Sequence, residues 1–229
     1  MATYDLEEQE QIAEVKAWWK QYGNRLVNAA TIIALIVIAW QGWNWYQRKQ
    51  TGEASVIYGA LQQAVATKNT QQIKAASGEL LEKFGGTSYA VLGALTSANA
   101  MIEAGDTQTA KVQLQWAAEH AKDELRDLAQ LRGAAVLLDE KAYDQALGQL
   151  SGASSLAFEM RFQDMRGDIL VAQGKKTDAV SAYRAALAKL SELEKAGKSS
   201  GSGFESQGEA NTVFRDLTNQ KIEALGGDQ

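Results

Sequence analysis

His120 is the residue whose type best suits general-base chemistry near neutral pH, because the 229 residues contain one histidine and no cysteine. A serine hydrolase would place a serine nucleophile and a carboxylate beside it, but nothing in the pattern marks a serine for that role. His120 follows Glu119 and precedes Lys122 at the expected end of a helix, where a cationic residue is favourable. We interpret His120 as a helix-terminal residue, and a membrane-tethered hydrolase as the weakest functional hypothesis.

Other candidate chemical motifs are incomplete. The sequence GKKT at 174–177 resembles part of a phosphate-binding loop, but that motif needs a glycine where Ile169 stands. The acidic pairs at 123–124 and 139–140 lie at expected helix ends, where solvated caps are the usual explanation. The absence of cysteine excludes disulfides and thiolate-bound zinc or iron–sulfur clusters. The sequence therefore predicts a protein that is not an enzyme, with no catalytic residue, cofactor or metal ion.

Helices must supply the surfaces of any binding site. From Gly52 onward, Ala, Leu, Gln and Glu recur with helical spacing, and no segment alternates as a strand would. The chain contains no proline, which favours uninterrupted helices. Short breaks predict antiparallel neighbours. The breaks fall at 68–70, 85–87, 105–106, 122–123, 139–141, 151–155 and 173–176.

The predicted helices repeat. Ala110, Ala146 and Ala179 fall in register, 36 and 33 residues apart, with a larger residue four positions after each. Small residues at matching positions let paired helices approach closely, while the larger residue fills the gap between pairs. The predicted repeat-packing residues are Ala98, Ala110, Ala117, Ala134, Ala146, Ala153, Gly167, Ala179 and Ala186.

The helix–turn–helix form and this period are typical of tetratricopeptide repeats, which are about 34 residues long, although their usual proline is missing. We expect an all-α fold with a tetratricopeptide-like solenoid of about four helix pairs over 52–196. A flexible Gly/Ser linker is expected over 197–203, and a C-terminal helix over 204–225 that caps the array. The alternative is an unrelated Ala-rich helical bundle.

The concave side of such a solenoid is the natural binding surface, because the first helix of each pair lines it. By register, the predicted groove residues are Asn99, Ile102, Leu138, Asp168 and Val171. A lining of apolar, amide and acidic groups could hold extended or partly unfolded peptide. The alternative for each residue is a place in the core.

Residues 26–47 contain no charged side chain and lie between Arg25 and Arg48. The apolar part, 26–45, would span roughly 30 Å as a helix, about the thickness of the bilayer core. Tryptophan and tyrosine gather at both ends, which suits membrane interfaces. No Ala-x-Ala site follows, so we predict an uncleaved transmembrane helix rather than a signal peptide or a soluble core helix. The predicted anchor residues are Leu26, Ile33, Ile36, Trp40, Trp43 and Trp45.

Residues 1–25 form an amphipathic tail whose three basic residues, against two just after the span, favour a cytoplasmic N-terminus. The formal net charge of −5 argues against nucleic-acid binding. Ala30 and Ala34 form a small-xxx-small pair, a weak signal for dimerisation, and nothing else in the sequence indicates a homo-oligomer.

The sequence resembles the YfgM family, ancillary membrane subunits of the bacterial Sec translocon. The resemblance begins with EEQEQIAEVKAWWKQYGNRL (7–26) before a single span, and continues through the exit WQGWNWYQ. It includes the repeat around SANAMIEAGDTQTAKVQLQWA and the ending NQKIEAL, and so covers essentially the whole chain. The segment GKSSGSGFESQGEA (197–210) departs from it and looks like an insertion before the last helix.

The resemblance implies a single-pass protein of the bacterial inner membrane, with a cytoplasmic N-terminus and a periplasmic repeat domain. The implied partners are the Sec translocon channel, a membrane-anchored periplasmic chaperone of the prolyl-isomerase class, translocated polypeptides and the lipid bilayer. Our first hypothesis is a non-enzymatic, chaperone-like accessory of the translocon. The alternative is a tetratricopeptide scaffold for another envelope complex.

Overall fold

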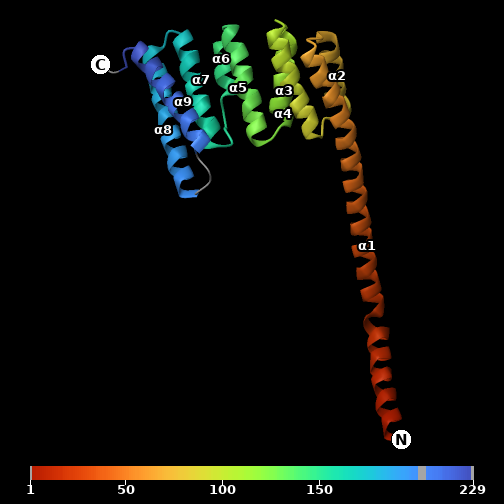
Figure 1. Ribbon diagram of the computed structural model, residues 1–229. Helices are drawn as coiled ribbons and strands as arrows, with labels where there is room; N and C mark the ends of the chain where they lie inside the picture. The colour runs from red at the N-terminus through yellow and green to blue at the C-terminus, as the bar shows by residue number, and fades with distance from the viewer. Residues whose placement is uncertain (1, 201–204, 228–229) are drawn as a thin grey trace. The chain divides into compact units, whose positions relative to one another are not determined.

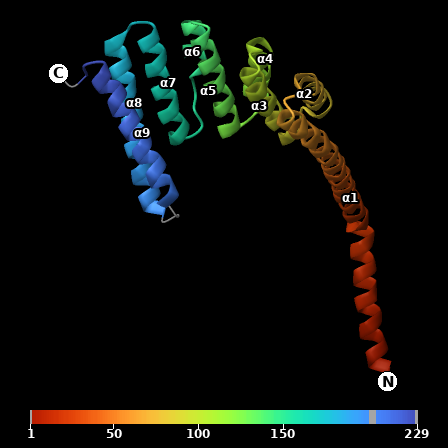
Figure 2. The same ribbon diagram turned by 45° about the horizontal axis from the view of Figure 1, so that its top comes forward.

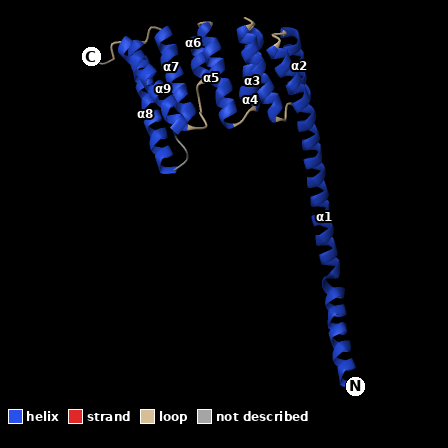
Figure 3. Ribbon diagram, in the orientation of Figure 1, coloured by secondary structure: helices blue, strands red, loops and turns tan. Residues whose placement is uncertain are grey.

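The computed structural model describes residues 2–200 and 205–227, and the regular elements of this part are all helices (Figure 3). The chain divides into two compact units, residues 1–52 and residues 53–229. The described helices are α1 (Ala2–Ala66), α2 (Thr70–Phe84), α3 (Ser88–Glu103), α4 (Thr107–His120), α5 (Asp123–Asp139), α6 (Tyr143–Gln149), α7 (Leu156–Ala172), α8 (Lys176–Ser200) and α9 (Glu205–Ala224). The all-α prediction is confirmed for these residues.

In the first unit, α1 exposes most of the apolar run between residues 26 and 47. Ile33 and Ile36 are each 62% exposed, and none of the most apolar 18-residue window is buried. The hydroxyl of Thr31 donates to the carbonyl of Val27 at 2.8 Å, so this polar group is satisfied inside the helix. Within the described residues, α1 is the one helix long and apolar enough to cross a membrane.

Aromatic side chains lie at both ends of the apolar run. The rings of Trp18 and Tyr22 have centroids 5.9 Å apart, and those of Trp43 and Tyr46 lie 6.3 Å apart. Such rings combine an apolar body with a polar edge, as membrane interfaces require. Side chains of residues 1–15, on which much of the predicted amphipathic pattern depends, lie outside the described part.

The helix does not end where the predicted anchor ends, because α1 continues without a break from residue 47 to Ala66. No proline or positive-φ residue interrupts it. In the second unit, Ala54, Leu61 and Ala64 of α1 are buried in a core with α2, α3 and α4. The last turns of α1 are therefore the first helix of the first repeat.

The described residues of the second unit form four helix pairs and a terminal helix. The pairs are the end of α1 with α2, then α3 with α4, α5 with α6, and α7 with α8. Each pair packs on the next, and α9 lies beside α8 in both views (Figures 1 and 2). The predicted order of elements is confirmed.

All four pairs contain the same turn, which explains why repeats with different sequences share one geometry. Lys68, Gly105, Lys141 and Gly174 each have φ between 53° and 79°, a left-handed conformation that glycine adopts most easily. In each pair the next residue donates its N–H to the carbonyl five residues earlier, at 2.8–2.9 Å. This hydrogen bond is that of a Schellman helix end.

The small residues of the repeat lie in the helix interfaces. The buried members are Ala98, Ala110, Ala117, Ala134, Ala146, Gly167, Ala179 and Ala186. Ala153 lies in the loop after α6, which ends at Gln149, and packs half-buried against the second core cluster. The larger residues Leu114, Leu150 and Tyr183 are each only 2% exposed, as fillers of the gaps between pairs would be.

The C-terminal region differs from the predicted boundaries. Helix α8 continues to Ser200, into the expected 197–203 linker, and residues 201–204 lie outside the described part. In α9, Ile222 is buried against α7 and α8, whereas Val213 and Leu217 are more than half exposed. Helix α9 therefore covers the end of the array with one face only.

Candidate functional site

A cleft of about 320 Å³ lies between the end of α1, α3 and α5, the first helices of the first three pairs. We call it the inner cleft. Its lining is Val65, Leu92, Leu95, Thr96, Asn99, Ala100, Glu103, Leu125, Leu128 and Arg132. Apolar side chains form most of this surface and a few polar groups stand among them, which is the usual composition of a ligand site.

Two polar arrangements lie in the inner cleft. The Asn99 side chain donates from Nδ2 to Oε1 of Glu103 at 3.1 Å. Arg132 donates from Nη1 to the main-chain carbonyl of Leu95 at 3.5 Å, which is long for a hydrogen bond. A peptide crossing the cleft would therefore meet an amide and a carboxylate on α3 and a cation on α5.

The predicted groove residues do not form one surface. Asn99 lines the inner cleft. Ile102 and Val171, at equivalent register positions, are 36% and 38% exposed but do not line it. Leu138, at the same register position, packs half-buried against the second core cluster. Of these four residues predicted from the repeat register, Asn99 lies in the inner cleft and the other three lie elsewhere.

Asp168, the fifth predicted groove residue, holds α9 against α7 instead. Its carboxylate accepts a hydrogen bond from the Tyr183 hydroxyl at 2.7 Å and pairs with Lys221 of α9 at 2.8 Å. Lys221 also pairs with Asp164 at 3.0 Å and lies over the Tyr183 ring. Burial raises the pKa of Tyr183, and the hydrogen bond to Asp168 raises that pKa further. Both contacts lie on Oδ1 of Asp168, so this carboxylate already has partners within the domain, and its place in a peptide groove stays a prediction.

Arg132 is the cation of the inner cleft, and the sequence prediction missed it. Arg132 and Thr96 each precede a small packing residue, Ala134 and Ala98, by two positions, and both line the cleft. The repeat register contained this signal, but the positions used were one and four residues after the small residue. A helix has more than one exposed side, so register alone leaves this choice open.

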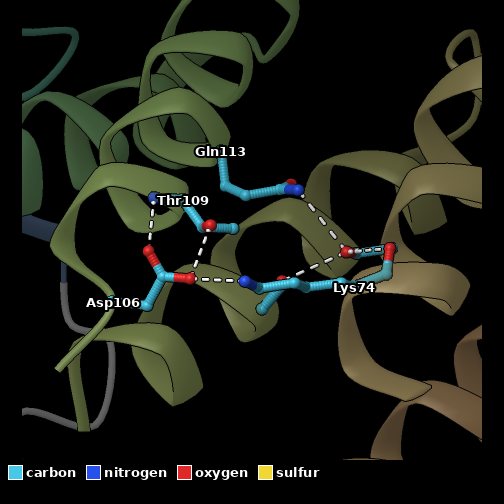
Figure 4. Close-up of polar contacts among 6 residues, drawn as sticks. Lys74, Asp106, Thr109 and Gln113 are labelled. Carbon is cyan, nitrogen blue, oxygen red and sulfur yellow. Dashed lines mark hydrogen bonds and ion pairs between the residues drawn. The ribbon is translucent and has the colours of Figure 1, made fainter. Parts of the chain in front are cut away.

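A buried polar cluster joins α2, α3 and α4 beside the core of the first two pairs (Figure 4). Ser97 donates to Ser77 Oγ at 3.1 Å, and Ser77 donates to the main-chain carbonyl of Lys74 at 3.3 Å. The Gln113 amide points at Ser77 from α4 at 3.4 Å. Among the described residues, the hydrogen-bond partners of Ser77 include no base, so the cluster links helices rather than activating a nucleophile.

Lys74 of α2 pairs with Asp106 across the same interface at 2.5 Å (Figure 4). Asp106 is the N-cap of α4 and accepts hydrogen bonds from the backbone N–H and the hydroxyl of Thr109 at 3.0 and 2.8 Å. The hydrogen bond from Lys74 is the main reason why the pKa of Asp106 falls to about 2, and the Thr109 bonds lower it further. A cap and an ion pair thus share one carboxylate.

The loop after α6 is tied to α5 by Asp127, whose side chain is fully buried. Its carboxylate accepts hydrogen bonds from the backbone N–H and the hydroxyl of Ser154, both at 2.6 Å, and pairs with Arg126 at 2.9 Å. Arg126 also donates to the carbonyl of Gly152 at 2.7 Å. Burial opposes ionisation of Asp127, but the Ser154 and Arg126 contacts outweigh it and lower the pKa.

His120 lies at the C-terminal end of α4, as predicted. Its ring stacks on Trp116 with centroids 4.2 Å apart, and Nδ1 lies 2.9 Å from the Trp116 carbonyl. Gly174, from the phosphate-loop-like GKKT, is the left-handed turn residue between α7 and α8. The end of α4 therefore explains His120, and the turn between α7 and α8 explains Gly174.

Comparison with known proteins agrees with the fold. A family model described as a tetratricopeptide repeat-like domain matches residues 16–199. A protein of Haemophilus influenzae named ancillary SecYEG translocon subunit is 30% identical over 192 residues, covering 83% of this chain and 94% of that protein. This chain belongs to the YfgM family. The resemblance seen in the sequence is therefore confirmed.

Other members of the YfgM family show the same extent of similarity. Proteins of the same name from Neisseria gonorrhoeae and Escherichia coli are 28% and 29% identical, and the matches cover 90% and 86% of those proteins. No solved structure matches the chain significantly. The family described by these names is not one of enzymes.

Proposed function

We propose that this YfgM family member is a non-enzymatic ancillary subunit of the Sec translocon in the bacterial inner membrane. The observation that carries the proposal is the combination, in one chain, of an exposed apolar helix able to cross a membrane and a repeat domain with an open cleft. The relatives named as SecYEG subunits support the assignment to the translocon.

In the proposed topology, residues 1–25 lie in the cytoplasm, residues 26–47 cross the membrane and the repeat domain lies in the periplasm. The basic residues before the span support this orientation. A tether of this kind raises the effective concentration of the domain near the channel, so weak and transient binding is sufficient.

The proposed ligands of the inner cleft are segments of newly translocated polypeptides, held by apolar contacts and by Asn99 and Arg132. A membrane-anchored periplasmic chaperone of the prolyl-isomerase class is the proposed second partner. Together these contacts would give the protein a chaperone-like role without catalysis.

Site-specific photo-crosslinking in native membranes tests this function. A photoreactive residue at Asn99 should capture channel subunits or translocating chains, whereas the same residue at the exposed Asp178 of α8 should capture far less. Capture of neither from Asn99, with the protein intact in the membrane, would contradict the proposal. A stable partner unrelated to export would instead favour the scaffold alternative.

The absence of native cysteine makes the orientation testable with single substitutions. Gln21→Cys and Gln108→Cys place a thiol at exposed positions on either side of the predicted span. In intact spheroplasts, a membrane-impermeant maleimide should label Gln108→Cys only. Labelling of Gln21→Cys only would reverse the proposed topology.

A further inference from the structure

A second groove, of about 430 Å³, lies between α4 and α6 with α5 as its floor. Ala129, Gly133 and Leu137 contribute the floor. These residues lie on a different side of α5 from Leu128 and Arg132, which line the inner cleft. Because four glutamines of α4 and α6 line it, Gln108, Gln115, Gln145 and Gln149, we call it the glutamine groove.

Two glycines of the groove have no packing explanation, Gly133 in the interior of α5 and Gly148 next to the last residue of α6. A Cβ at Gly133 would meet nothing closer than the Gln149 side chain at 4.0 Å, and one at Gly148 would meet nothing within 4 Å. At Gly93, by contrast, a Cβ would approach Leu80 to 2.6 Å, so glycine is required there by packing. Glycine inside a helix is less stable than alanine by about 0.5–1 kcal/mol, and close approach of another backbone is one established use for it.

The groove lining suits a main chain rather than a charged ligand. Each glutamine amide can both donate and accept, as the alternating N–H and C=O groups of a polypeptide require. Lys111, the one ionisable residue of the lining, pairs with Glu140 at 2.7 Å. Val112 of α4 is 57% exposed and could cover small apolar side chains of a bound chain.

We propose that the glutamine groove binds a short stretch of extended, unfolded polypeptide through its main chain, with the bound backbone passing over Gly133 and Gly148. An extended segment has unpaired main-chain groups for the amides, whereas a helix satisfies its own. Main-chain recognition places little demand on the sequence of the bound segment. This inference rests on the proposed function, since it adds to the inner cleft a second surface on which translocated chains are held.

The test uses the full-length protein in detergent micelles and a fluorescent peptide, acetyl-Gly-Ser-Val-Ser-Ala-Ser-Val-Gly-amide. A matched peptide carries N-methyl groups on alternate residues, so its side chains are unchanged but it donates fewer hydrogen bonds. Fluorescence anisotropy should show binding of the first peptide, and binding of the N-methylated peptide should be roughly tenfold weaker or more. Equal affinity for both, or no binding of the first peptide at millimolar concentration, would overturn the inference.

Gly133→Leu fills the floor of the groove and should weaken peptide binding at least tenfold. Gly78→Leu on α2 is the matched control, because that exposed position is equally open and lies outside the groove lining. If Gly133→Leu misfolds by circular dichroism, the double substitution Gln145→Ala and Gln149→Ala removes two amides without filling the space and should also weaken binding. Unchanged affinity in the folded groove variants would place the peptide elsewhere.

Co-isolation with the translocon channel separates the two proposals. The groove variants keep the apolar span unchanged, so they should still co-isolate with the channel from membranes. If the wild-type chain co-isolated with the channel but did not bind the peptide, the groove proposal alone would be refuted. Peptide binding without co-isolation of the wild-type chain would refute the translocon function and leave the groove standing.

Discussion

The contact between Gly167 and Tyr183 provides the sharpest test of how the repeats pack. Gly167 occupies the small-residue position of α7, and Tyr183 of α8 fills the gap beside it. A Cβ added at Gly167 would lie 2.5 Å from Cδ1 and 2.8 Å from Cζ of the tyrosine ring. Gly167→Ala therefore forces the ring to move, and with it the hydroxyl that donates to Asp168 at 2.7 Å.

The expected destabilisation is the sum of three effects. Overpacking a core contact costs about 1–3 kcal/mol. Loss of a hydrogen bond to a carboxylate costs about 1.5–3 kcal/mol. Alanine regains about 0.5–1 kcal/mol of helix stability relative to glycine. Because the ring can keep part of the hydrogen bond as it moves, we expect a net loss of about 2–4 kcal/mol in the free energy of unfolding.

Urea unfolding of the full chain in mild detergent, followed by circular dichroism, measures this difference. Gly78→Ala is the control, and should be neutral or more stable by about 0.5–1 kcal/mol because its Cβ enters open space. Combining Gly167→Ala with Tyr183→Leu should recover part of the loss, since both changes act on one contact. If Gly167→Ala were as stable as Gly78→Ala, the account of glycine and tyrosine as complementary partners would be wrong.

Three further substitutions test separate parts of the molecule. Asp106→Asn keeps the N-cap of α4 but removes the ion pair with Lys74, so it should be less stable than wild type at pH 7. Because the folded-state pKa of Asp106 is depressed to about 2, this difference should be complete above about pH 4 and disappear as the pH falls to about 2 in thermal melts. Asp127→Asn weakens the hydrogen bonds from Ser154 and should lower the unfolding free energy by about 1–3 kcal/mol. Proteolysis in the 150–155 loop should become faster. An unaltered digestion rate would show that these hydrogen bonds do not fix the loop to α5. Ile36→Asp places a charge near the middle of the span, which raises the free energy of membrane insertion by about 3 kcal/mol. Alkaline extraction should therefore release more of this variant from membranes than of Ile36→Val.

The inner cleft was only partly predictable from the sequence. The register of Ala98 and Ala134 correctly fixed which residues are buried, because a small side chain at a helix crossing is recognisable from its spacing. The register does not distinguish the exposed sides of a helix from one another. Asn99 was therefore found and Arg132 missed, although both line the cleft.

Asp168 shows a second reason why site prediction fell short. A half-exposed acidic residue on the first helix of a pair has the pattern of a groove position. Its role depends on Lys221, 53 positions later in the chain, which the docking of α9 brings to within 2.8 Å. Long-range pairs of this kind leave no periodic signal.

The sequence by itself determined the elements: a charge-free run long enough to cross a bilayer, helices separated by short breaks, and small residues at repeated positions. These are local or periodic properties, and neighbouring residues along one chain are enough to specify them. Only the tertiary structure decided where α1 passes from anchor to repeat, that a groove lies over Gly133 between α4 and α6, and that Lys221 of α9 pairs with Asp168. Those outcomes depend on which side chains meet across helices, and packing between distant segments, rather than local preference, sets them.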